Sequence, residues 1–220
     1  MIRGFRDRSD AGNRLAAMLR DYADRDDVLV LALPRGGVPV AAAIARELGA
    51  PLDVFLVRKL GVPGQAELAA GALAAGGIRV INTDIVQAFR ISEAALETII
   101  RREQAEIDRQ DIEYRSGLAP PAVAGRTVIL VDDGVATGST VLAAVRALRQ
   151  RDPARIILAV PVAARAVADV LRGEVEAVVC SIEAESLNGV SLWYDDFGQV
   201  TDAEVRAAIR PGGRSDLTRP

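Results

Sequence analysis

The sequence predicts an α/β fold in which a central, mostly parallel β-sheet is flanked by helices. Short apolar runs alternate with segments of helical periodicity along most of the 220 residues, as expected for repeated βαβ units. Several of these runs are continuous rather than alternating, which is typical of strands buried on both faces. The length suits one domain, so we expect a single domain over residues 1–220 with its core at about 27–182.

Periodicity and turn residues place the individual elements. In the first part of the chain we expect a helix at 10–22, a strand at 28–33, an alanine-rich helix ending near Gly49, a strand at 54–57, a possible strand at 78–81 and a charged helix at 92–112. In the second part we expect a strand at 127–131, a helix with Val141, Leu142, Val145 and Leu148 on one face, a strand at 156–160, a helix at 163–171 and a strand at 178–180.

Composition excludes several classes of function. The chain has no histidine, so it holds no Ser-His or Cys-His nucleophile pair and no histidine-ligated metal. Its one cysteine, Cys180, cannot form an intrachain disulfide, which fits a reducing cytosol. A formal charge of −3 and 4% aromatic residues argue against a nucleic-acid surface. The charged start and the lack of an apolar stretch of about 20 residues favour a cytoplasmic protein that does not enter a membrane.

The segment 128–140 carries the strongest functional signal. An apolar strand ends in Asp132 and Asp133, and a loop of small residues then opens a helix. Backbone N–H groups in such a loop, at the positive end of a helix, suit an anion. Paired carboxylates suit a vicinal diol or hydrated Mg²⁺. Together they describe a site for a ribose 5-phosphate; the alternative is an acidic cap on an ordinary strand-to-helix turn.

This thirteen-residue pattern resembles the signature of the type I phosphoribosyltransferases. The resemblance implies a fold with a flexible flap and a small hood. It implies that Asp132 and Asp133 hold the ribose hydroxyls of phosphoribosyl pyrophosphate, with Mg²⁺ bound through that substrate and possibly to these carboxylates. It also implies that the 5-phosphate lies on the loop residues Gly134, Ala136, Thr137, Gly138, Ser139 and Thr140.

Two further basic turns follow predicted strands. Arg35 precedes Gly36 and Gly37, and resembles the family's pyrophosphate loop, which often contains a strained peptide beside its basic residue. Arg58 and Lys59, the only lysine, are expected at the end of the second strand, and in the family a basic residue there contacts pyrophosphate. The surrounding 57–64 is similar to adenine phosphoribosyltransferases. The alternatives are a plain glycine turn and a strand-end charge pair.

The remaining parts of the site are expected in a flap and a hood. The flap is placed at about 60–77, with Gln65 and Glu67 as candidate contacts; the alternatives are a disordered insertion or a β-hairpin. The hood combines the N-terminal segment with about 183–210. There, Trp193 or Tyr194 could stack on a base and Asp195 or Asp196 could accept from an exocyclic amine, unless these rings only close the edge of the core.

The resemblance implies a Mg²⁺-dependent transfer of 5-phosphoribosyl to a nitrogen acceptor, most simply a nucleobase in purine or pyrimidine salvage, with release of pyrophosphate. Arg35, Lys59, Asp132 and Asp133 are the candidate catalytic residues. Ala136 stands where hypoxanthine-guanine enzymes carry an aspartate, which argues against a 6-oxopurine specialist. The alternatives are a regulatory protein that binds phosphoribosyl pyrophosphate and, less favoured, a Rossmann domain, although no Gly-x-Gly-x-x-Gly follows the first strand. A homodimer is possible.

Overall fold

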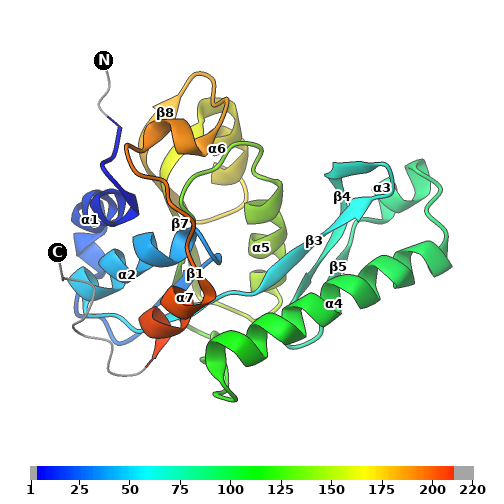
Figure 1. Cartoon of the computed structure of the whole chain (residues 1–220), viewed down its shortest axis with the longest axis horizontal. Helices are drawn as coiled ribbons and strands as arrows, with labels where there is room; N and C mark the ends of the chain where they lie inside the picture. Colours follow the sequence, from blue (N-terminus) through cyan, green and yellow to red (C-terminus); the bar gives the residue numbers. More distant parts are fainter. Residues whose placement is uncertain (1–3, 211–220) are drawn as a thin grey trace.

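The computed structural model describes residues 4–210, without the side chains of Ala66 and Glu67. Its centre is a parallel sheet built from β1 (Val28–Ala32), β2 (Leu52–Val54), β6 (Thr127–Val131), β7 (Arg155–Ala164) and β8 (Ala177–Ala184). The strands lie in the order β2-β1-β6-β7-β8, with helices packed on both faces (Figure 1). The predicted α/β class, with a central parallel sheet, is confirmed.

Strands β1 and β6 form the middle of this sheet, and every residue of both is buried. Successive residues of a strand point to opposite faces, so each strand contributes to two apolar layers. On one face Val28, Val30 and Ala32 pack with α1 (Arg8–Met18) and α2 (Gly37–Leu48). On the other face Leu29 and Leu31 pack with α5 (Ser139–Arg149) and α6 (Arg165–Arg172). Burial on both faces explains why these strands are recognisable as continuous apolar runs.

The helix ends follow local chemistry. Helix α2 stops at Gly49, whose φ of +65° is the left-handed conformation that glycine adopts most readily. Helix α1 begins after Asp7, whose carboxylate accepts a hydrogen bond from the backbone N–H of Asp10 at 2.7 Å. Helix α7 (Asp202–Ile209) begins with a capping box between Thr201 and Glu204. These caps fix where each helix meets the sheet.

A second sheet departs from the sequence-based expectation. It is antiparallel and consists of β3 (Val57–Val62), β4 (Gln65–Ala74) and β5 (Ile78–Ile81) in that order. The strand expected at 54–57 is therefore divided, because β2 ends at Val54 and the chain leaves the parallel sheet before β3. Arg58 and Lys59 lie within β3 and not at the end of a parallel strand, so that expected position is wrong.

Small residues explain why the second sheet is hard to predict. Strand β4 is rich in alanine and glycine and lacks the β-branched residues that normally mark a strand. A Cβ atom on Gly71 would lie 2.4 Å from the carbonyl oxygen of Val80, so the close approach of β4 and β5 requires glycine there. The segment expected as a flap is thus a β-hairpin extended by a third strand. After α3 (Thr83–Ala88), the long helix α4 (Glu93–Arg115) runs beside this sheet (Figure 1).

The N-terminal segment joins a segment near the end of the chain. Phe5 and Tyr194 form an isolated parallel bridge. The backbone N–H of Phe5 donates to Trp193 at 2.8 Å, and that of Asp195 donates to Phe5 at 2.9 Å. The short 3₁₀ helix η2 (Val190–Trp193) precedes this junction. We call the joined residues 4–8 and 190–198 the hood.

None of the helices within residues 4–210 has both the length and the apolar character needed to cross a membrane.

Candidate functional site

Two of the predicted turns meet where β1 and β6 end. The backbone N–H of Leu33 donates to the carbonyl oxygen of Val131 at 2.8 Å, and the peptide bond between Pro34 and Arg35 is cis. A Cβ atom on Gly37 would lie 2.6 Å from the same carbonyl oxygen. The turn at 34–37 therefore packs directly on the acidic end of β6, and it can do so because glycine has no side chain. Ligands of open α/β sheets bind at this carboxyl edge.

The two carboxylates of the acidic pair are half-buried, and they have different hydrogen-bond partners. The carboxylate of Asp132 accepts a hydrogen bond from the backbone N–H of Asp133 at 2.9 Å. Burial, together with the neighbouring charge of Asp133, raises the pKa of Asp132 to about 8. Burial also raises the pKa of Asp133, while the guanidinium of Arg8 opposes that change. The contact with Arg8 therefore favours the ionised form of Asp133 over that of Asp132.

Arg8 is a site residue that the sequence analysis missed. Its Nε donates to Oδ2 of Asp133 at 2.9 Å, and its Nη1 donates to the carbonyl oxygen of Gly198 at 2.7 Å. Its guanidinium also lies 3.7 Å from the centre of the Phe197 ring. In the sequence, Arg8 is distinguished only by its place in the first turn of a helix, where a cation is disfavoured by the helix dipole.

The aromatic residues of the hood pack mainly on one another. Tyr194 is only 8% exposed, and its ring lies 5.4 Å from that of Phe5 and 5.0 Å from that of Phe197. Its hydroxyl donates to the backbone carbonyl of Asp133 at 2.6 Å. Tyr194 therefore braces the acidic turn, which fits the alternative that these rings close the core edge. Trp193 is half-buried, and Asp195 and Asp196 are exposed.

The small-residue loop is anchored at one point and open elsewhere. Val135 is buried and bridges Ala163, with its N–H donating to Val162 at 2.9 Å. Beyond this anchor, Ala136, Thr137 and Thr140 are exposed, while Gly134, Gly138 and Ser139 are half-buried. Gly138 has a φ of +76° and is the N-cap of α5. The exposed residues of the loop therefore lie at the positive end of an eleven-residue helix, where an anion is favoured.

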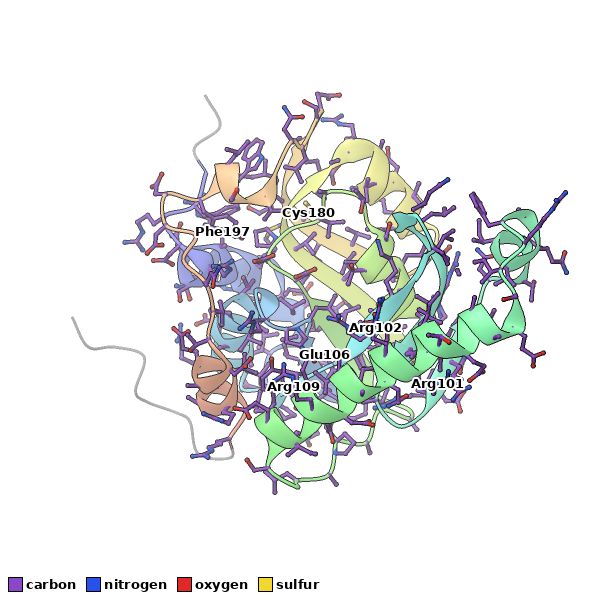
Figure 2. The ribbon with its side chains drawn as sticks, turned by 45° about the vertical axis from the view of Figure 1, so that its right-hand side comes forward. Arg101, Arg102, Glu106, Arg109, Cys180 and Phe197 are labelled. Carbon is purple, nitrogen blue, oxygen red and sulfur yellow. The ribbon has the colours of Figure 1, made fainter. Side chains whose placement is uncertain are left out.

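The charges of three arginines act on one carboxylate of α4. Glu106 of α4 accepts hydrogen bonds from Arg109, both at 2.9 Å, and this contact, with the charges of Arg58 and Arg35, lowers the pKa of Glu106. Figure 2 shows Arg102, Glu106 and Arg109 succeeding one another along α4. The sequence analysis missed Arg109, because its three-residue spacing from Glu106 is typical of a solvated helix face.

The same cluster extends through two further acidic residues. Asp202 lies 3.7 Å from Arg35 and 4.0 Å from Arg109, measured between charged atoms. Glu103 is largely buried and pairs with Nε of Arg58 at 2.9 Å. Arg58 therefore faces α4. Lys59 follows it in an extended strand and points to the opposite face of the second sheet.

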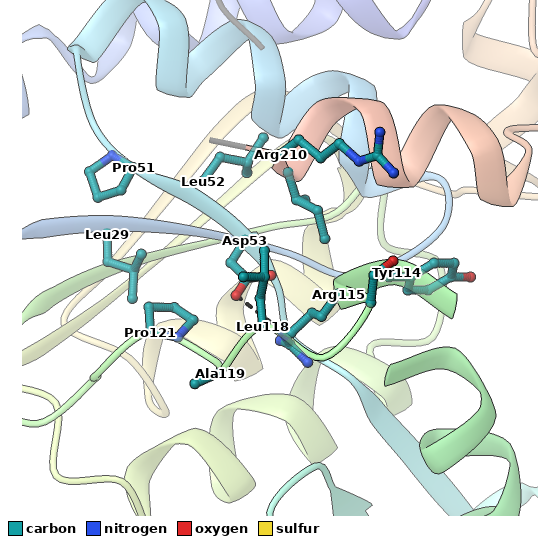
Figure 3. A pocket seen from close by; sticks show the side chains of 12 residues that line it. Leu29, Pro51, Leu52, Asp53, Tyr114, Arg115, Leu118, Ala119, Pro121 and Arg210 are labelled. Carbon is teal, nitrogen blue, oxygen red and sulfur yellow. Dashed lines mark hydrogen bonds and ion pairs between the residues drawn. The ribbon is translucent and has the colours of Figure 1, made fainter. Parts of the chain in front are cut away.

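The acidic turn is distinct from a cavity at the other end of the sheet (Figure 3). This cavity has a volume of about 250 Å³ and lies near the start of β1, where Leu29, Pro51 and Leu52 line it. Arg115 is almost fully buried there and pairs with Asp53 at 3.2 Å. A second cavity of about 340 Å³ adjoins the small-residue loop at Thr137, Gly138 and Ser139.

Comparison with known proteins identifies the family. Residues 6–192 match the phosphoribosyl transferase domain. The chain belongs to this family. It is 41% identical over 205 residues to Rv0571c of Mycobacterium tuberculosis, whose name provisionally assigns it to the phosphoribosyl transferases. That match covers 93% of this chain and 46% of Rv0571c, so the chain spans about half the length of the curated relative.

Solved structures agree with the fold of this phosphoribosyl transferase domain. TT1426 of Thermus thermophilus is 40% identical with a TM-score of 0.84, covering 94% of this chain and 97% of TT1426. The AQ2163 protein of Aquifex aeolicus is 12% identical with a TM-score of 0.52, covering 82% of this chain and 76% of AQ2163, and shares the fold alone. The first match extends over the second sheet and α4 as well as the central sheet, because it covers nearly the whole of both chains.

Mg²⁺, which the phosphoribosyl transferase family implies, fits this domain only as an ion carried by a substrate. Within residues 4–210, no cluster of three or more acidic, cysteine or histidine side chains could hold a metal ion. The acidic pair supplies two carboxylates, and the contact of Arg8 with Asp133 involves only Oδ2. Mg²⁺ commonly keeps several waters and binds through one or two carboxylates together with substrate phosphates, so Asp132 and Asp133 suit such a contact.

The predicted site residues are thus only partly brought together. The turns carrying Arg35 and Asp133 touch, and the small-residue loop follows the acidic pair directly. Arg58 pairs with Glu103 of α4, whereas Arg35 pairs with Asp202 of α7, which also lies 4.0 Å from Arg109. Gln65 lies at the start of β4, in the second sheet. The side chain of Glu67 lies outside the described residues.

Proposed function

We propose that this phosphoribosyl transferase domain transfers the 5-phosphoribosyl group of phosphoribosyl pyrophosphate to a nitrogen acceptor. The observation that carries the proposal is the contact between Gly36 and Asp133. It places a glycine turn with a basic residue against a paired carboxylate, and an open anion-binding loop follows at the same sheet edge. These parts suit a sugar that carries phosphate groups at both ends.

Each part has a role in this proposal. Backbone N–H groups at Ala136–Thr140 hold the 5-phosphate, with hydroxyls from Thr137, Ser139 and Thr140. Asp132 and Asp133 accept the ribose hydroxyls. The N–H groups of the 34–37 turn hold the pyrophosphate. We include Arg58 and Arg109 as cations on the pyrophosphate side, because their charges act together with that of Arg35 on the carboxylate of Glu106. We also include Lys59, which would have to approach the pyrophosphate from the opposite face of the second sheet.

The reaction breaks the bond from C1 of ribose to pyrophosphate and forms a bond from C1 to the acceptor nitrogen, whose proton is released to solvent. Positive charge develops on the ribose ring, as in glycoside transfer. The ionised Asp133 favours that charge, while Arg35 stabilises the departing pyrophosphate. Mg²⁺ bound to pyrophosphate oxygens would neutralise further negative charge.

The acceptor that we propose is a nucleobase bound beneath the hood. Ala136 offers no acid or base, so the acceptor must react without a protein group at that position. Asp195 and Asp196 are exposed residues of the hood and could accept hydrogen bonds from an exocyclic amine. The second sheet, with Gln65 and Glu67 in β4, is our candidate for the element that covers the reacting centre.

A screen of bases and amines tests this function. Phosphoribosyl pyrophosphate and Mg²⁺ are incubated with each acceptor, released pyrophosphate is measured, and the product is identified by mass spectrometry. Turnover with one acceptor class, lost in Asp133→Asn, is the expected result. Tight binding of phosphoribosyl pyrophosphate without any turnover would favour the regulatory alternative. If calorimetry detects no binding of phosphoribosyl pyrophosphate, both functions are wrong.

A further inference from the structure

Arg8 and Asp133 form a largely buried ion pair between the hood and the acidic turn. They are 125 residues apart in sequence, and their side chains are only 11% and 16% exposed. The contact is a single charge-assisted hydrogen bond from Nε of Arg8 to Oδ2 of Asp133, at 2.9 Å. It is not the bidentate arrangement that would use both carboxylate oxygens.

Arg8 has further contacts that hold it in place independently of Asp133. It donates to the carbonyl oxygen of Gly198 at 2.7 Å, and its guanidinium lies over the ring of Phe197 at 3.7 Å. Its backbone lies in the first turn of α1, which packs against α2. Arg8 is therefore a fixed donor.

Asp133 is confined from the other side as well. The absent side chain of Gly36 leaves the space that its carboxylate occupies, since a Cβ atom there would lie 2.0 Å from Oδ2. Tyr194 holds the backbone carbonyl of the same residue at 2.6 Å. An ionised carboxylate offers about four lone-pair sites, and the Arg8 contact uses one of them. The contact thus sets the orientation of the carboxylate and leaves capacity to accept other hydrogen bonds.

We propose that Arg8 is a positioning residue that orients the Asp133 carboxylate to accept ribose hydroxyls. This inference rests on the proposed function and adds the hood to the ribose site. Arg8 does not need to touch the substrate; it acts through Asp133. A residue that only covered the Asp133 carboxylate would have to move away when ribose binds. Arg8 stays in place, because it is held by Phe197 and Gly198.

Substitution of Arg8 tests the proposal. We expect Arg8→Ala to raise KM and Kd for phosphoribosyl pyrophosphate about tenfold to a hundredfold, because an oriented charge-assisted hydrogen bond is lost. We expect kcat to change less than about threefold, because Arg8→Ala leaves the charge of Asp133, which favours the positive ribose ring, in place. Arg8→Lys keeps the charge and should recover part of the affinity, although it loses the flat stacking on Phe197.

The matched control is Arg14→Ala. Arg14 lies on the same helix, pairs with Asp10 at 2.9 Å and lies 4.9 Å from the Phe5 ring, but it makes no hydrogen bond or ion pair with Asp133. It should leave KM within about twofold of the wild type. In the Asp133→Asn background, Arg8→Ala should add less than about twofold, because the two residues act through one contact.

The outcomes separate the inference from the proposed function. If the wild type does not bind phosphoribosyl pyrophosphate, the proposed function fails. If the wild type binds it and Arg8→Ala binds it equally well or more tightly, only the positioning role fails, and tighter binding would show that Arg8 competes with ribose. If Arg8→Ala does not fold, Arg8→Gln decides, because it keeps an apolar stem and removes the charge: unchanged affinity there would overturn the proposal.

Discussion

A Cβ atom on Gly36 would lie 2.0 Å from Oδ2 of Asp133, so the Asp133 carboxylate occupies the space that a side chain at residue 36 would need. The next glycine faces a different obstacle. A Cβ atom on Gly37 would lie 2.6 Å from the backbone carbonyl oxygen of Val131 and 3.0 Å from the Cα atom of Asp132. A carboxylate can move aside, but the backbone of a central strand cannot, so the two glycines should respond differently to the same substitution.

We expect Gly36→Ala to fold and to lose affinity for phosphoribosyl pyrophosphate by tenfold or more, about 1.4 kcal/mol, because the Asp133 carboxylate must turn away from Arg8. We expect Gly37→Ala to lower the free energy of unfolding by about 1–3 kcal/mol through overpacking. Calorimetric binding and urea denaturation of both variants measure these effects. Equal loss of stability in both would contradict the distinction.

Removal of the Tyr194 hydroxyl isolates one hydrogen bond. Tyr194→Phe keeps the ring packed between Phe5 and Phe197 but leaves the carbonyl of Asp133 without that donor. An unsatisfied, largely buried acceptor costs about 1–3 kcal/mol. Thermal melting should show the loss, and binding of phosphoribosyl pyrophosphate should weaken with it. Unchanged melting would mean that water replaces the hydroxyl.

Asp132 should make stability depend on pH. Its pKa is about 8 in the folded protein, against about 3.9 in an unfolded chain, so the folded state keeps a proton that the unfolded state releases. That contribution to stability is complete below pH about 4 and is lost as the pH rises through 8. We expect Asp132→Asn, which resembles the protonated acid, to have a free energy of unfolding about 1–3 kcal/mol greater than that of the wild type at pH 8–9, and therefore to melt at a higher temperature.

The control for this measurement is Asp26→Asn, a change at an exposed loop residue. It should leave the dependence of the melting temperature on pH unchanged. If Asp132→Asn melts with the same slope against pH as the wild type, Asp132 is ionised throughout and its environment is more polar than the structure indicates.

Arg109 should contribute to the pyrophosphate side. Arg109→Ala removes one of three arginines around Glu106, and we expect inhibition by pyrophosphate to weaken about threefold to tenfold, a modest effect because the side chain is 52% exposed. Arg101→Ala is the matched control: it lies on the same helix and donates to Thr98 instead. Equal effects of the two changes would point to general charge and not to a site.

The central fold could be predicted because strands that are buried on both faces have a recognisable sequence pattern. Strands β1 and β6 are buried on both faces, so their residues form continuous apolar runs, and the glycine after α2 marks its end. The second sheet leaves no such trace. Its β4 strand uses alanine and glycine because β5 approaches too closely for larger side chains at Gly71, and that composition also suits a loop.

The candidate site likewise contains one part that could be predicted from the sequence and one part that could not. Asp132, Asp133 and the small-residue loop are consecutive, so their pattern is visible locally. Arg8 reaches Asp133 across 125 residues, and Arg109 reaches the cluster around Arg35 through Glu106 and Asp202. Such long-range contacts depend on how the hood and α4 pack, and no local spacing reports them.

The backbone bridge from Phe5 to Tyr194 has a practical consequence for anyone who trims or tags this chain. A deletion of residues 1–8 would remove both Phe5, the bridge partner of Tyr194, and the guanidinium of Arg8 beside Asp133. Phe5 is fully buried against Tyr194, so a chain shortened in this way would lose stability as well as the donor to Asp133. Binding measured on such a preparation would not represent the intact candidate site.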